Sequence, residues 1–167
     1  MAEKFTETEY RALAELRYRI RRFLQEGDVT AQQAGLEPQQ YLLLLAIRGL
    51  PEGEEAAIRT LAERLSLRHH STVELIDRME ARGYVKRSRG KADRRQVLVS
   101  LQPRGERLLE KVVEQRIIEL RSNGRALVDA ISALLESRTY SSTAEIKRRR
   151  EAAAKSRKQT AAKRAGH

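Results

Sequence analysis

The fold of this chain is decided by residues 61–101, which read LAERLSLRHHSTVELIDRMEARGYVKRSRGKADRRQVLVSL. In the middle of this stretch, side chains suited to a core recur at i, i+3, i+4 and i+7, which predicts the buried face of a helix: Thr72, Leu75, Ile76 and Met79. Gly83 is expected to end this helix. A shorter stripe from Ile58 to Leu65 predicts a preceding helix, and residues 66–68 are the tight connection between the two.

After Gly83 the pattern changes from helical to alternating. Tyr84 and Val85 begin one predicted strand, and a second strand places three residues on one face: Val97, Val99 and Leu101. Residues 86–95 between them read KRSRGKADRR, which is too charged to be core. This tip is either a solvated loop or a contact to DNA phosphates and a minor groove, and the adjacent helix pair favours the contact. The whole stretch therefore predicts a winged helix-turn-helix.

The same stretch carries short matches at family-like spacings: Asp77-Arg78-Met79-Glu80, Gly83-Tyr84-Val85, Asp93-Arg94-Arg95 and Val99-Ser100-Leu101. On these residues the chain resembles the MarR family of bacterial transcriptional regulators, over roughly residues 8–138. It departs from the family pattern at Met79 and Tyr84, where the family has leucine, and at Gln102, where the family has threonine. The resemblance implies an obligate dimer that binds a pseudo-palindromic operator and that often responds to a small aromatic or phenolic ligand.

The outward face of the second helix supplies candidate DNA contacts. At its start, His69 and His70 can hydrogen-bond bases or phosphates, although one of them can instead cap or pack at the turn. Ser71 either contacts DNA or caps the helix. Val73 suits a thymine methyl group. Arg78 contacts a phosphate unless it pairs with the glutamate four residues before it.

The hairpin supplies the remaining candidates. Arg95 matches the arginine of the family's Asp-x-Arg motif, and we expect Asp93 to orient it through a charge-assisted hydrogen bond. Arg89, Lys91 and Arg94 are candidates for reaching the minor groove and its phosphates. The complete set of predicted DNA-binding residues is Arg68, His69, His70, Ser71, Val73, Glu74, Arg78, Arg87, Arg89, Lys91, Asp93, Arg94 and Arg95.

Composition restricts the other classes of function. The chain of 167 residues carries 34 Lys+Arg against 23 Asp+Glu, and a formal net charge of +11 favours nucleic acid over a membrane surface as partner. No apolar run approaches the ~20 residues that span a bilayer, and no signal-peptide pattern opens the chain, so we expect a cytoplasmic protein. Cysteine is absent and histidines number 3, so we expect no disulfide, thiol sensor, metal or cofactor. No catalytic motif is recognisable, so we expect no enzyme.

Helices on both sides of the winged stretch are expected to form a dimer. An apolar stripe from Leu13 to Leu24 follows a capping-box pair, Thr6 and Glu9. Residues 103–144 carry two further stripes, which we assign to two helices because Ser122-Asn123-Gly124 resembles a turn. A small winged domain cannot cover all three stripes, so a C₂ homodimer is predicted. The alternative is a helical layer closed within one chain.

We therefore predict a mainly α chain with a small β-hairpin wing. Its parts are an N-terminal dimerisation helix (residues 1–35), the winged helix-turn-helix domain (36–102), C-terminal dimerisation helices (103–144) and a basic, disordered tail (145–167). The tail has nine basic and two acidic residues, hence +7 of the net charge. It is either a nonspecific DNA anchor or a solubilising end.

Glu37-Pro38 opens a further predicted helix, which runs through the apolar residues 41–47. An effector pocket is expected where this helix, the N-terminal helix, the long helix predicted from Pro103 and the winged domain meet. Its candidate residues, which also fit core and surface roles, are Arg17, Tyr18, Arg21, Tyr41 and Leu45. The two arginines favour an anionic ligand. The predicted function is a homodimeric, sequence-specific transcriptional regulator, a repressor released by a small aromatic or anionic ligand. The alternative is a sequence-tolerant architectural DNA-binding protein that uses its basic tail.

Overall fold

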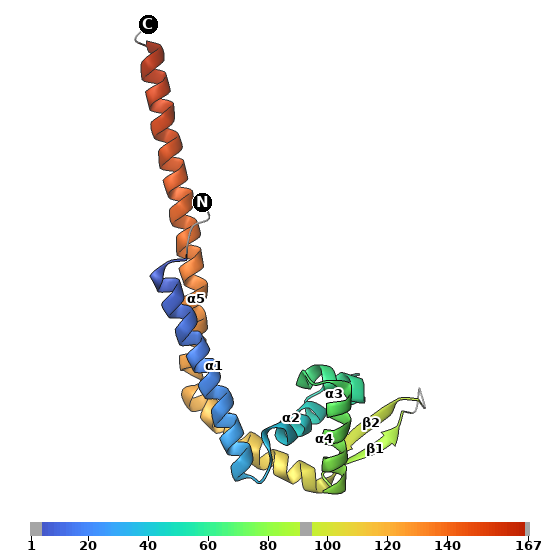
Figure 1. Cartoon of the computed structure of the whole chain (residues 1–167). Coiled ribbons are helices and arrows are strands. Elements are labelled where there is room, and N and C mark those ends of the chain that lie inside the picture. The colour runs from blue at the N-terminus through green and yellow to red at the C-terminus, as the bar shows by residue number, and fades with distance from the viewer. Residues whose placement is uncertain (1–4, 91–94, 166–167) are drawn as a thin grey trace. The chain divides into compact units, whose positions relative to one another are not determined.

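The computed structural model describes residues 5–90 and 95–165, with side chains described as far as residue 136. In these residues the elements follow the order α1 (Glu7–Gln33), α2 (Pro38–Arg48), α3 (Ile58–Leu65), α4 (His69–Ala81), β1 (Val85–Arg89), β2 (Val97–Leu101) and α5 (Pro103–Ala165) (Figure 1). This mainly helical fold with a two-stranded wing confirms the predicted fold class. The chain divides into two compact units: one is Arg22–Ser122, and the other joins Met1–Arg21 to Asn123–His167.

The core of the unit Arg22–Ser122 is shared by α2, α3, α4, the two strands and the start of α5, where Leu109 and Val112 are buried. Its fully buried side chains include Leu43 and Leu44 of α2, Leu61 of α3, and Ile76 and Met79 of α4. The predicted inward stripe of α4 is buried along its whole length, which confirms the helical period in the sequence. Burial of each such aliphatic side chain stabilises the fold by about 1.5–3 kcal/mol, so α4 is held by its packing.

Positive-φ residues end α3 and α4. Ser66 has φ 53° at the C-cap of α3, and its backbone N–H donates to the Glu63 carbonyl, so the chain turns directly toward α4. Gly83 has φ 68° after α4, a conformation that costs glycine no steric clash. The N–H of Tyr84 then donates to the Met79 carbonyl over 3.0 Å, which closes the last turn of α4. The predicted stop at Gly83 is confirmed.

The wing is an antiparallel pair in which Val85 faces Leu101 and Arg89 faces Val97. Its inner face is apolar, since Val85 and Val99 are buried. The connection before α3 also pairs with β2, because the Val99 N–H donates to the Ala56 carbonyl over 2.9 Å. The wing is therefore attached to the helix-turn-helix by backbone hydrogen bonds as well as by packing.

The first turn of α5 is fixed against the end of α4. The Gln102 N–H donates to the Tyr84 carbonyl over 2.9 Å, a backbone bond that does not depend on the side chain at position 102. A Cβ on Gly105 would lie 2.2 Å from that same carbonyl oxygen, so this close approach needs glycine. The start of α5 is thereby linked to the residues that follow α4.

Two expectations for residues after 103 are wrong. The structure has one continuous α5 through Ser122-Asn123-Gly124, where we expected a turn between two helices. A helix-interior glycine costs only about 1 kcal/mol, which flanking helix formers offset, and the Ser122 hydroxyl donates to the Ile118 carbonyl inside the helix. The helix also continues to Ala165, through the segment expected to be disordered, because alanine, lysine, arginine and glutamate are good helix formers.

Within Arg22–Ser122, α1 and α5 are joined by a buried arginine. The Arg116 Nη2 donates to the Phe23 carbonyl over 2.9 Å, and the guanidinium lies 4.6 Å from the centroid of the Phe23 ring. Arg116 also pairs with Glu119, whose carboxylate accepts a hydrogen bond from Thr30. A Cβ on Gly27 would come within 3.4 Å of Arg116 Nε, so the small residue leaves room for the guanidinium.

The other unit contains the first turns of α1 and the part of α5 after Ser122. The predicted capping box is confirmed, since the Thr6 N–H donates to Glu9 and the Glu9 N–H donates to the Thr6 hydroxyl. Ala130 is buried in this unit. Large apolar side chains nevertheless stay exposed here, among them Leu13, Tyr18, Ile20, Val128, Ile131 and Leu135. None of the described helices is both long and apolar enough to cross a membrane.

Candidate nucleic-acid interface

The N-terminal turn of α4 is open to solvent. Arg68 occupies the N-cap position, so neither His69 nor His70 caps the helix, and all three residues are exposed. The Arg68 side chain makes no capping hydrogen bond, which leaves backbone N–H groups of the first turn available to an anion. This turn combines exposed imidazoles, a guanidinium and the positive end of a helix dipole, an arrangement suited to base edges and phosphates.

The other predicted α4 residues differ in exposure. Ser71 and Val73 are half-buried, whereas Glu74 and Arg78 are exposed. Within the described side chains, Arg78 and Glu74 make no ion pair with each other, so the surface-pair alternative for Arg78 has no support. A phosphate contact by Arg78 stays a prediction.

Arg87 on β1 is engaged by α4. Its Nη1 lies 2.6 Å from Asp77 Oδ1 and 2.8 Å from Glu80 Oε2, and its Nη2 donates to the Val73 carbonyl over 3.2 Å. The Arg87 backbone N–H also donates to Glu80 Oε1 over 2.8 Å. The hydrogen bond from the Arg87 backbone N–H is the main cause that lowers the pKa of the Glu80 carboxyl, and the bond from the Arg87 guanidinium lowers it further.

The Arg87 contacts connect the wing to the recognition helix. With a side chain only 23% exposed and donors directed at three α4 residues, Arg87 has little left for a phosphate, so the predicted DNA contact is disfavoured. The geometry assigns Arg87 instead to positioning α4. The sequence feature that could have predicted this role of Arg87 is the pair Asp77 and Glu80, which lie one turn apart on α4 and face the same strand.

The wing holds the remaining predicted contacts. Arg89 at the end of β1 and Arg95 before β2 are exposed, although Arg95 also takes part in an interaction within the chain. Lys91, Asp93 and Arg94 lie outside the described residues, and so does the expected hydrogen bond between Asp93 and Arg95. DNA contact by the wing tip therefore stays a prediction.

The five predicted effector residues are divided between the two units. Arg17, Tyr18 and Arg21 belong to the unit that contains Met1–Arg21, where all three are exposed. Tyr41 and Leu45 belong to Arg22–Ser122, where Tyr41 is buried and Leu45 is partly exposed. Burial raises the pKa of the Tyr41 phenol, and the nearby Arg116 charge opposes this rise. A shared pocket for these residues stays a prediction.

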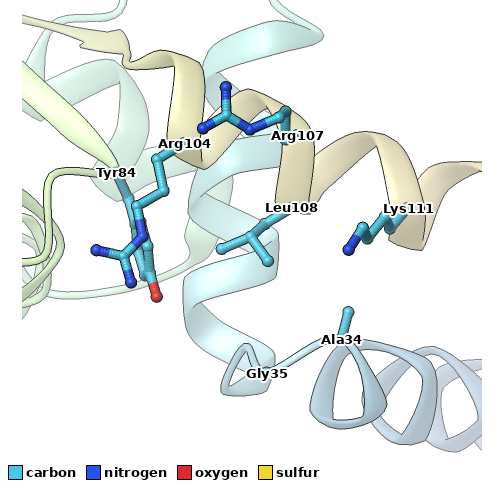
Figure 2. Close-up of a pocket in the computed structure, with 7 residues that line it drawn as sticks. All are labelled: Ala34, Gly35, Tyr84, Arg104, Arg107, Leu108 and Lys111. Atoms are coloured by element: carbon cyan, nitrogen blue, oxygen red, sulfur yellow. The ribbon is translucent and has the colours of Figure 1, made fainter.

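A different pocket, of about 290 Å³, lies within Arg22–Ser122 (Figure 2). It is lined by Ala34 and Gly35 after α1, by Tyr84 and by the first turns of α5, and none of the five predicted effector residues lines it. The sequence feature that could have pointed to this pocket is a set of basic residues at i, i+3 and i+7 on α5: Arg104, Arg107 and Lys111.

Comparison with known proteins identifies the family. A family model described as MarR family matches residues 34–96, from the α1–α2 connection into the wing. The protein named "Uncharacterized HTH-type transcriptional regulator YsmB" from Bacillus subtilis (strain 168) is 30% identical over 125 residues, which cover 75% of this chain and 84% of that protein. The chain belongs to the MarR family.

Solved structures of MarR proteins have the same fold. AbsC, a MarR family transcriptional regulator from Streptomyces coelicolor, is 23% identical with a TM-score of 0.62, and covers 77% of this chain and 84% of that chain. A MarR family protein from Bacillus stearothermophilus is 25% identical with a TM-score of 0.61, and covers 86% of this chain and 99% of that chain. This MarR protein is thus a DNA-binding transcriptional regulator rather than an enzyme.

Proposed function

We propose that this MarR protein acts as a homodimeric, sequence-specific repressor. The observation that carries the proposal is the recognition helix α4: its inner face is buried, its first turn is exposed, and Arg87 holds its position against the wing. A helix held in this way presents His69 and His70 at defined positions relative to the groove. Sequence reading needs such a fixed helix, whereas nonspecific binding needs only positive charge.

Exposed apolar side chains on α1 and α5 support the homodimer. In addition to those of the terminal unit, the unit Arg22–Ser122 exposes Leu24, Ile117, Ile118 and Leu120. So many large apolar groups favour burial against a second copy, since each Å² removed from water contributes about 25 cal/mol. Their exposure disfavours the alternative in which one chain covers its own stripes. A two-fold dimer presents two α4 helices to successive major grooves about one DNA turn apart.

Repression follows from occupancy of such a site. A dimer that covers a promoter-proximal inverted repeat excludes the transcription machinery. A small aromatic or anionic ligand with a higher affinity for the DNA-incompetent dimer would release it. The competing proposal is an architectural protein that binds DNA through the basic segment 145–167, which holds nine basic residues against two acidic ones.

The test is selection of bound fragments from random duplex DNA by the full chain at near-physiological salt, followed by sequencing. We expect an inverted repeat with half-sites about ten base pairs apart. A promoter that carries this repeat should then give less transcript in vitro when the protein is added. Tight binding with no enriched motif would favour the architectural protein, and increased transcript would contradict repression.

A further inference from the structure

The buried face of α1 is formed by small side chains. The α1 residues that are buried are Gly27, Thr30 and Ala31. None of them projects far from the helix, so none can insert like a large apolar side chain into one particular gap of a neighbouring helix. Apolar packing at these positions therefore gives α1 little preference for one register along α5.

A charged residue lies in the buried stripe of α5. Leu109, Val112 and Arg116 are buried and follow one another at i, i+3 and i+7, the spacing of a core-facing stripe. Arg116 is only 8% exposed, although the first two positions of the stripe are aliphatic. In coiled coils, one polar residue at such a position selects a register at a cost in stability.

Arg116 and its ion-pair partner Glu119 bond to α1 at two points. The Arg116 guanidinium donates to the Phe23 carbonyl over 2.9 Å, and the Thr30 hydroxyl donates to Glu119 Oε1 over 3.3 Å. These two points lie about two helical turns apart on α1. The first bond is made to the backbone, so it depends on the position of α1 along α5. A slip of one turn, about 5.4 Å, would break both bonds.

A largely buried ion pair of this kind adds little net stability. Desolvation of the two charges offsets their attraction, and replacement of both by well-packed apolar residues is often neutral or stabilising. Loss of one partner is costly, because the other charge is left unpaired. A role in register therefore differs from a role in stability: replacing both residues should keep the fold and lose the register.

The register determines how exposed apolar groups line up. Leu24 directly follows Phe23 on α1, and Ile117 directly follows Arg116 on α5. Leu24 is 58% exposed and Ile117 is 43% exposed. The bond from Arg116 to Phe23 thus fixes where these two groups lie relative to each other, and a slip of one turn would move one past the other by about 5.4 Å.

We infer that Arg116 is a positioning residue that sets the register of α1 against α5, with Glu119 as its partner, and that the pair specifies geometry rather than adding stability. In the proposed homodimer, the aligned apolar groups set how a second copy docks and hence the separation of the two α4 helices. Only this consequence, for the spacing of the DNA half-sites, rests on the proposed function.

Spin-label distances on the full chain test the register directly. The sequence contains no cysteine, so Gln25→Cys on α1 and Glu114→Cys on α5 place one label on each helix, both at exposed positions. Dilution with excess unlabelled chain restricts the measured distance to one subunit. The wild-type background should give one narrow distance distribution. Arg116→Met combined with Glu119→Leu should give a broader distribution or a second population, while the melting temperature stays equal or rises.

Two further variants complete the test. Arg59→Met with Glu63→Leu removes an exposed ion pair of α3 by the same two changes, so the distribution should stay narrow. Arg116→Met alone leaves Glu119 without the guanidinium and should lower the melting temperature more than the double replacement does. A narrow, wild-type distribution in the double variant would overturn the proposal, because apolar packing would then set the register. A double variant that melts as low as Arg116→Met would also overturn it, because the pair would then serve stability.

Selection from random duplex DNA keeps this proposal separate from the repressor proposal. The wild type should enrich repeats with one half-site spacing, and the double variant should enrich repeats with several spacings. A changed label distance with an unchanged half-site spacing would overturn the consequence for DNA alone. If the wild type enriches no repeat, the repressor proposal fails, and the spin-label distances still decide whether Arg116 sets the register.

Discussion

The helix α4 buries its whole apolar stripe, whereas α5 buries Leu109 and Val112 near its start and leaves later apolar side chains exposed. All four residues of the α4 stripe are buried within the same chain. Large apolar side chains of α5, such as Ile118 and Leu135, are more than half exposed. The packing of α4 is therefore completed by one chain, whereas α5 leaves exposed apolar surface, which we propose is covered by a second copy.

A core substitution in α4 should give the largest effect. Ile76 is fully buried, and Ile76→Ala should lower the free energy of unfolding by about 2–5 kcal/mol because it leaves a cavity. Denaturant titration at fixed protein concentration measures this loss. Leu42→Ala, at a partly exposed α2 position, is the control and should cost clearly less. A similar loss for both variants would contradict a self-contained α4 core.

A charge on the exposed surface of α5 should break the dimer. Ile118 is 53% exposed, and Ile118→Asp places a carboxylate where the partner is expected to bury it, which disfavours the dimer by about 100-fold or more. Analytical ultracentrifugation should show monomer, and DNA affinity should fall with it. Leu42→Asp makes the same change on α2 and should remain dimeric. An unchanged dimer in Ile118→Asp would place the interface elsewhere.

Removal of the link between wing and α4 should give an intermediate effect. Arg87→Gln loses the bonds to Asp77 and Glu80, so α4 is less well positioned, and operator affinity should fall about tenfold. Arg87→Lys should not rescue binding, since an ammonium cannot reproduce the fork of the guanidinium. Arg59→Gln, which breaks an exposed ion pair with Glu63, is the control. A salt slope lowered by about one with no loss of stability would instead indicate that Arg87 contacts a phosphate.

The smallest effect concerns pH. The lowered pKa of Glu80 means that its contribution to stability is present above its ordinary value of 4.5 and is lost as pH falls through the lower value in the folded state. The stability advantage of wild type over Glu80→Gln should therefore shrink between pH 5 and pH 3 in denaturant titrations. Glu110→Gln, at an exposed α5 position, serves as the control. An advantage that stays constant over this range would refute the assigned role of Glu80.

Several features of the candidate site were predictable because they depend on local spacing. The α4 stripe, the glycine after α4 and the basic hairpin each involve residues close together in sequence. Three features were missed: the carboxylate partners of Arg87, the Arg116 contacts between α1 and α5, and the Tyr84 side of the α5 pocket. The last two join elements that are distant in sequence, so spacing along the chain carries no direct record of them. Arg87 lies only seven residues after Glu80, but the contact depends on how β1 folds back against α4.

The sequence by itself determined the winged helix-turn-helix, because helical and strand periods follow from backbone geometry. Its short motifs carried the resemblance to the MarR family, and its composition sets the net positive charge. Only the tertiary structure decided which charges are engaged. Arg87 and Arg107 are both arginines, yet one contacts two carboxylates of α4 and the other lines an open pocket. The physical reason is that the state of a charged side chain depends on which groups the packing of other elements brings within a few ångströms.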